Sequence, residues 1–172
     1  MTRIALFILF TMMSFTCEAK SVNERYSSFL TQNGIIHFFR PTKLDRFNGI
    51  DNFNYDMTYL SKKDSITINC SIDLKDNHLV HLFKIQNGIQ EITGDDTYMM
   101  FRDVTKKGYR IRLSSRFPIR EIVELFVSNQ PLTFCIETTQ NITLSATYTP
   151  SHWKKENKIM TRILQSITTY NF

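Results

Sequence analysis

The sequence predicts a mainly β fold: an antiparallel β-sandwich of about eight or nine strands with one short internal helix and a C-terminal amphipathic helix. Apolar and polar residues alternate with a period of two in many short segments, as they do in half-buried strands. Turn residues separate these segments at near-regular intervals, which is typical of sandwiches and barrels. After residues 118 and 149 the apolar spacing changes to that of a helix.

The first 19 residues have the pattern of a cleavable export signal. Arg3 is the only charge before Glu18, and an apolar segment of signal-peptide length follows it. A cut after Ala19 leaves residues 20–172 as a single domain in the periplasm or outside the cell. Two alternatives stay open: an uncleaved membrane anchor, and lipid attachment at Cys17.

Strands are expected wherever the two-residue alternation is regular. The clearest case covers residues 66–74, where the apolar positions are Ile66, Ile68, Cys70, Ile72 and Leu74. Other segments with this alternation are 53–59, 109–113, 132–136 and 142–148. Successive side chains of a strand point to opposite faces, so this pattern gives one face to the core and one to solvent.

Three further segments are apolar at consecutive positions, and they are expected to form central strands of a packed sheet. They cover residues 35–39, 79–85 and 99–104. A strand that is buried on both faces needs no alternation, and this is the basis of the prediction.

Turns between the strands are marked by polar residues and glycine. Residues 61–64 connect the strands at 53–59 and 66–74. Asn87-Gly88 predicts a two-residue type I′ hairpin, and Lys106-Lys107-Gly108 predicts a second, looser one.

The internal helix is expected after Pro118, a residue that suits the first helical position. Apolar residues at helical spacing follow: Ile119, Ile122, Val123 and Phe126. Asn129 and Pro131 then end the helix.

The C-terminal helix is expected to begin with Thr149 as its cap and Pro150 as its first residue. One apolar stripe runs along it: Trp153, Met160, Ile163, Leu164 and Ile167. Two interpretations stay open. The stripe packs against the protein's own sheet, or it forms an interaction helix for a partner or a membrane surface.

Export leaves two cysteines, Cys70 and Cys135, outside a reducing compartment, where a disulfide can form. Their positions argue against it, because Cys70 occupies the apolar phase of its strand and Cys135 the polar phase. The sequence therefore leaves open whether the two thiols are bridged or free.

No catalytic, cofactor, metal or nucleotide motif is present. His78 and His81 are the only close histidine pair, and at that spacing on a strand they point to opposite faces. The net charge of +5 arises from scattered basic residues, which together with export argues against a nucleic-acid partner.

These observations predict an exported, non-enzymatic interaction or structural module that binds a protein or polysaccharide of the envelope or exterior. Membrane contact is a less favoured prediction. The alternative is an extracytoplasmic hydrolase that acts on a wall or polysaccharide substrate. Its acids would come from scattered residues: Glu91, Asp95, Asp96 and Glu137.

Overall fold

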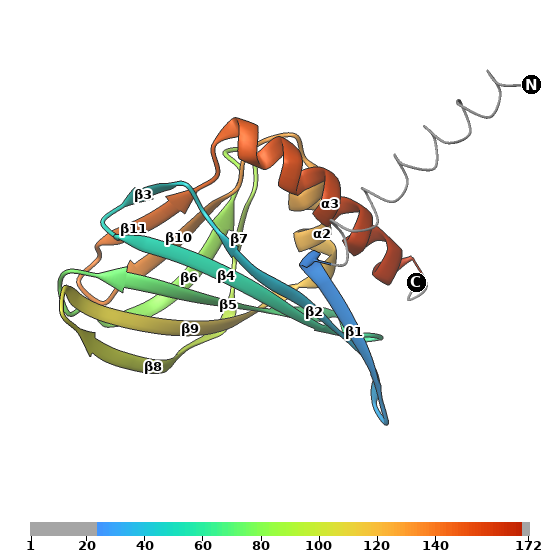
Figure 1. Cartoon of the computed structure of the whole chain (residues 1–172), viewed down its shortest axis with the longest axis horizontal. Coiled ribbons are helices and arrows are strands. Elements are labelled where there is room, and N and C mark those ends of the chain that lie inside the picture. Colours follow the sequence, from blue (N-terminus) through green and yellow to red (C-terminus); the bar gives the residue numbers. More distant parts are fainter. Residues whose placement is uncertain (1–23, 170–172) are drawn as a thin grey trace, which may run out of the picture.

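The computed structural model describes residues 24–169, which fold into two antiparallel β-sheets and two helices (Figure 1). The strands are β1 (Tyr26–Thr31), β2 (Gly34–Lys43), β3 (Arg46–Asn48), β4 (Asn52–Leu60), β5 (Ser65–Leu74), β6 (Val80–Gln86), β7 (Glu91–Thr93), β8 (Asp95–Thr105), β9 (Gly108–Pro118), β10 (Thr133–Thr138) and β11 (Thr143–Thr147). The helices are α2 (Ile119–Val127) and α3 (Pro150–Thr168). The predicted sandwich with one internal and one C-terminal helix is confirmed.

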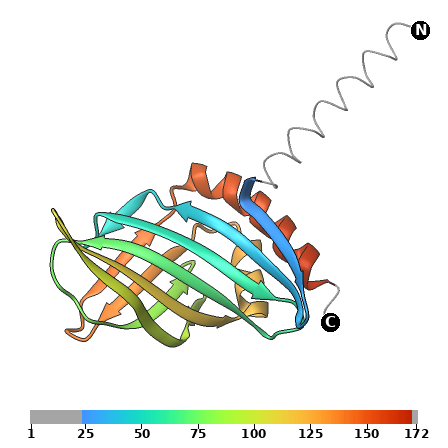
Figure 2. The ribbon, with the colours of Figure 1, turned by 60° about the horizontal axis from the view of Figure 1, so that its bottom comes forward.

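One sheet has six strands in the order β1-β2-β4-β5-β9-β8, and the other has five in the order β3-β11-β10-β6-β7. The chain crosses between the two sheets five times: from β2 to β3, from β3 to β4, from β5 to β6, from β7 to β8 at Gly94, and from β9 to β10. Figure 2 shows the strands of the six-stranded sheet side by side across the front, with both helices behind them.

The core lies between the inner faces of the two sheets. In β5, every residue of the predicted apolar face is buried, and the residues between them are half-buried. The ring of Phe134 connects the sheets, because it lies 5.4 Å from the ring of Phe53 and 4.6 Å from that of Tyr55. Each fully buried aromatic or branched side chain contributes about 1.5–3 kcal/mol of transfer free energy.

Both helices gather at one end of the sandwich, with α3 outside α2 (Figure 1). The predicted helix after Pro118 is confirmed, although α2 begins at Ile119 and Pro118 is the last residue of β9. The helices are joined by the rings of Phe126 and Trp153, 5.6 Å apart, and by Thr161 Oγ1, which donates to the Phe126 carbonyl.

The start of α3 is as predicted. The Thr149 hydroxyl accepts a hydrogen bond from the backbone N–H of His152, and Pro150 is the first helical residue. All five residues of the predicted interaction stripe are buried in the hydrophobic core. They therefore hold the helix to its own domain, and an interaction through them would require α3 to leave the core. Among the helices of residues 24–169, none has the length and apolar character to cross a membrane.

Three details differ from the sequence predictions. The described residues form eleven strands, whereas eight or nine are expected. The segment 99–104 is predicted to be central, but β8 is an edge strand of the six-stranded sheet and its apolar residues are largely exposed. The hairpin at Asn87-Gly88 is longer than two residues, because Gln86 pairs with Glu91. Asn87 Oδ1 accepts hydrogen bonds from the N–H groups of Ile89 and Gln90, so this side chain organises a four-residue turn.

The two cysteines are free, which corrects the disulfide alternative. Cys70 is on the inner face of β5, whereas Cys135 belongs to the other sheet and alternates with the inward-facing Phe134 and Ile136. The thiols therefore lie on different faces of different sheets and do not converge. Burial raises the pKa of both thiols, which makes them poor nucleophiles. The predicted signal at residues 1–19, including Cys17, lies outside the described residues.

Candidate functional site

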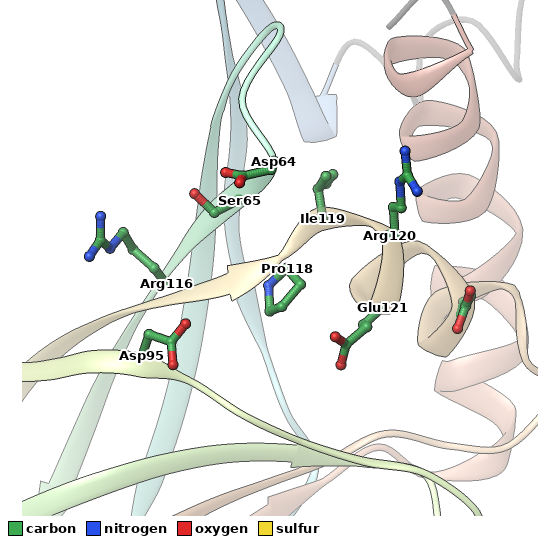
Figure 3. Close-up of a pocket in the computed structure, with 9 residues that line it drawn as sticks. Asp64, Ser65, Asp95, Arg116, Pro118, Ile119, Arg120 and Glu121 are labelled. Carbon is green, nitrogen blue, oxygen red and sulfur yellow. The ribbon is translucent and has the colours of Figure 1, made fainter. Parts of the chain in front are cut away.

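A cavity of about 660 Å³ lies at the corner where the β4–β5 hairpin, the start of β8, the end of β9 and the start of α2 meet (Figure 3). We call it the corner cavity. It is lined by Asp64, Ser65, Asp95, Arg116, Pro118, Ile119, Arg120, Glu121 and Glu124. Its volume is in the range of small-ligand sites.

Hydrogen bonds fix the elements that surround this cavity. The N–H of Ile119, the first residue of α2, donates to the carbonyl of Asp64 at 2.9 Å. The Ser115 hydroxyl of β9 donates to the carbonyl of Asp95 at 3.0 Å, and it also lies 2.9 Å from the Thr97 hydroxyl. The hairpin, both strands and the helix are thus held to one another at this corner.

Gly94 makes the corner tight enough for these contacts. A Cβ atom at this position would lie 2.2 Å from Ser115 Oγ and 2.7 Å from the ring of Phe117. No side chain can be accommodated at such distances without movement of the buried Phe117. The absence of a side chain therefore lets the chain pass from one sheet to the other directly against β9.

The charges of the corner cavity are mainly negative, with four carboxylates and two guanidinium groups in its lining. In Figure 3 the carboxylates of Asp95 and Glu121 extend into the space on either side of Pro118, and the guanidinium of Arg116 points away from it. Arg116 pairs with Asp96, outside the lining. Glu121 also lies in the first turn of α2, where the helix dipole stabilises a negative charge. The arrangement suits a cationic group.

The four acids proposed from the sequence do not come together. Asp95 lines the corner cavity, but Asp96 is paired with Arg116. Glu91 and Glu137 lie elsewhere, where both bind the Lys84 ammonium at 3.2 and 2.7 Å. These two hydrogen-bonded carboxylates raise the pKa of Lys84, and the three side chains form a surface ion-pair cluster.

The other carboxylates of the cavity were missed by sequence reasoning. Asp64 is in a turn, and Glu121 and Glu124 are on α2, so they come from parts of the chain far from Asp95. No spacing rule joins them, because only the packing of α2 against the hairpin brings them together.

Strand β8 begins at this cavity and continues as the free edge of the six-stranded sheet. It is eleven residues long, and its exposed apolar side chains are Tyr98, Met100, Phe101 and Val104. Val104 is 81% exposed and Tyr98 56%. Its pairing with β9 is interrupted twice, before Tyr98 and before Phe101, where the register shifts.

Strand β1 forms the opposite edge of the same sheet. It has six residues and also exposes apolar side chains, Phe29 and Leu30. The corner cavity at the start of β8 has no lining residue from β1. The two edges therefore offer a natural comparison for experiments.

Histidines supply no metal site in the part of the chain that the structure covers, residues 24–169, where no group of three or more His, Cys, Asp or Glu side chains could hold a metal ion. Comparison with protein-family models, with curated proteins and with solved structures finds no match for this chain. The geometry of the site is therefore the basis for its interpretation.

Proposed function

We propose that this chain is an exported, non-enzymatic binding module that pairs with an extended segment of an envelope or extracellular protein along β8. One observation carries the proposal: an eleven-residue edge strand with large exposed apolar side chains. Such an edge presents unpaired backbone N–H and carbonyl groups to a further strand. Addition of a strand to a sheet edge is a common mode of peptide recognition.

The chemistry of the edge favours a protein partner over a polysaccharide. A polypeptide strand satisfies the edge's backbone donors and acceptors in series, and its alternate side chains contact Tyr98 and Phe101. The acidic corner cavity at the start of β8 favours a partner with a basic residue near one end of the bound segment.

The experiment is site-specific photo-cross-linking in the native host. A photoreactive phenylalanine analogue replaces Tyr98 or Phe101 on β8, and Phe29 on β1 serves as the matched position at the other edge. We expect adducts from the β8 positions only. Peptide mapping of the adduct should place the cross-link in an extended, apolar segment of one partner protein.

A lysine at the edge supplies the control. Val104→Lys puts a charge on β8 and should abolish the adducts formed at Phe101, since edge charges oppose strand addition. Leu30→Lys on β1 should leave them unchanged. Adducts that arise from β1, or that survive Val104→Lys, would contradict the proposal, as would the absence of any adduct from β8.

The export part of the proposal is supported by Arg3 and the apolar segment that follows it. The mass of the mature protein tests it directly. Cleavage after Ala19 predicts a chain that begins at Lys20, whereas retention of residues 1–19 or a lipid on Cys17 would overturn this prediction.

A hydrolase is the second candidate function, and one observation favours it. The carboxylates of Asp95 and Glu121 extend into one cavity, as a general acid and base would need to do (Figure 3). This candidate predicts that the protein releases sugars from wall or polysaccharide substrates, and that Asp95→Asn and Glu121→Gln each abolish the release. Equal activity in these variants and in the matched Asp96→Asn would reject it.

A further inference from the structure

A second cavity, of about 490 Å³, lies between the loop that follows α2 and the first turns of α3. We call it the helix cavity. Its lining residues are Asn129, Gln130, Pro131, Pro150, Trp153, Lys154 and Asn157. In contrast to the corner cavity, this lining contains a cation and no carboxylate.

Trp153 forms part of the wall of the helix cavity and carries an unsatisfied donor. The side chain is only 2% exposed, and its indole Nε1 has no hydrogen-bond partner in the described structure. A buried N–H without an acceptor costs free energy, and most buried indoles find a partner. An acceptor oxygen on a bound ligand would satisfy this donor.

We propose that the helix cavity binds a small organic carboxylate that has a flat or ring-shaped body. Its carboxylate pairs with the ammonium of Lys154 and accepts the indole N–H of Trp153. Its body packs against the two pyrrolidine rings, of Pro131 and Pro150. The inference is independent of the partner strand proposed for β8, because the two surfaces share no residue.

Access to the indole nitrogen requires a small rearrangement, because this atom is covered in the free protein. Residues 129–131, between Ser128 and the buried Leu132, have no helix or strand and no buried side chain, so they are the part of the rim that can move. The Asn157 side chain holds the chain just before this segment, since its amide donates to the carbonyls of Phe126 and Ser128.

The sequence provides its own probe, because Trp153 is the one tryptophan in the chain. Its tryptophan fluorescence therefore reports on one side chain, which forms part of the wall of the helix cavity. The experiment titrates purified protein with benzoate, hippurate and glucuronate at up to millimolar concentration, and with benzamide as the uncharged match of benzoate. We expect a saturable change in fluorescence with at least one carboxylate, and binding of benzamide about tenfold weaker than that of benzoate.

Variants separate the two contacts. Lys154→Gln should weaken benzoate binding about tenfold and leave benzamide unchanged, whereas the neighbouring exposed Lys155→Gln should alter neither. Trp153→Phe should weaken both probes about fivefold, measured by calorimetry because this variant has no tryptophan. The proposal is overturned if no carboxylate gives a saturable change, if benzamide binds as well as benzoate, or if Lys154→Gln binds like the parent protein.

Discussion

The hydroxyl of Tyr26 lies 2.5 Å from Nδ1 of His37, and their rings are stacked with centroids 5.8 Å apart. On its other side the imidazole stacks on the ring of Tyr59, at 5.7 Å. His37 is therefore enclosed between tyrosines of β1 and β4 on the inner face of the six-stranded sheet. The contact between Tyr26 and His37 therefore helps to hold edge strand β1 to the sheet, and the imidazole of His37 can titrate.

The enclosure of His37 predicts a loss of stability on mild acidification. Burial lowers the pKa of His37 below its ordinary value of 6.5, so the folded site resists a proton that the unfolded chain accepts. The stabilising effect is complete above pH 6.5 and is lost as the pH falls from there toward the lower pKa of the folded protein. Urea unfolding at several pH values between about 7.5 and 5 measures this.

The matched variants are His37→Gln and His81→Gln. Glutamine does not titrate, so His37→Gln should have a flatter dependence of unfolding free energy on pH over this range. His81 is exposed, and its replacement should keep the parent slope. If the unfolding free energy of all three proteins changed with pH to the same extent, His37 would not be the cause of the loss of stability.

The hydroxyls of Tyr55 and Tyr148 form a pair 2.7 Å apart in the core. Burial raises the pKa of both phenols, so they stay protonated in the folded protein. Tyr55→Phe removes one partner and leaves the other hydroxyl buried and unpaired, which should cost about 1–3 kcal/mol. The double replacement with Tyr148→Phe should cost less than the sum of the single ones. Chemical unfolding of the four proteins tests this, and strict additivity would contradict it.

Asp45 binds Thr149, the cap residue of α3, from a distant part of the chain. Its carboxylate accepts hydrogen bonds from the N–H and hydroxyl of Thr149, each at 3.0 Å, and from His152 Nδ1 at 2.8 Å. Partial burial acts to raise the pKa of Asp45, but these hydrogen bonds outweigh it and lower the pKa below 3.8. The ionised carboxylate of Asp45 therefore stabilises the folded protein at neutral pH, and this stabilisation is lost as the pH falls through the acid range below 3.8.

Replacement of Asp45 is expected to lower the stability of the protein. Asp45→Ala should destabilise the protein by about 1 kcal/mol at neutral pH, because the hydrogen bonds to Thr149 and His152 are lost. The thermal midpoint measures it, and Asp76→Ala in a polar turn serves as the control. A difference that stays constant from neutral pH down to the acid range would argue against the role of the carboxylate charge.

Gly94 and Gly88 predict different responses to alanine. At Gly94 the new methyl group would collide with Ser115 and the buried ring of Phe117, so Gly94→Ala should destabilise the fold by about 1–3 kcal/mol. Gly88 has a φ of +82°, but a methyl group there would meet no atom of a non-adjacent residue within 4 Å. Gly88→Ala should therefore cost only the backbone strain, about 1 kcal/mol. Unfolding curves of both variants compare them, and equal losses would contradict the steric account.

Local pattern predicted most of the fold. The alternation in β5 placed all five buried side chains correctly, and the proline and cap residues placed the starts of both helices to within one residue. The buried face of a strand and the start of a helix depend on residues that are neighbours in sequence, so the local pattern is enough to predict them. The order of the strands in each sheet cannot be predicted from local pattern, since pairings such as β5 with β9 join segments that are distant in the chain.

The errors have physical causes. Consecutive apolar residues in β8 suggested burial on both faces, but β8 is an edge strand of the six-stranded sheet, so its apolar residues stay largely exposed. Neither cavity could be predicted. The corner cavity combines Asp64, Asp95 and Glu121 only after α2 docks, and the unpaired nitrogen of Trp153 is a property of packing.

The pairing of β5 with β9 has a consequence for how the chain is made. The two strands share ten paired positions in the middle of the six-stranded sheet, yet residues 75–108 must be synthesised between them. During synthesis the β4–β5 hairpin can form early, but one side of β5 stays open until β9 emerges. Long-range pairing of this kind slows folding and exposes an apolar strand for longer. If the chain is exported as we propose, this delay favours a chain that remains unfolded until it has crossed the membrane.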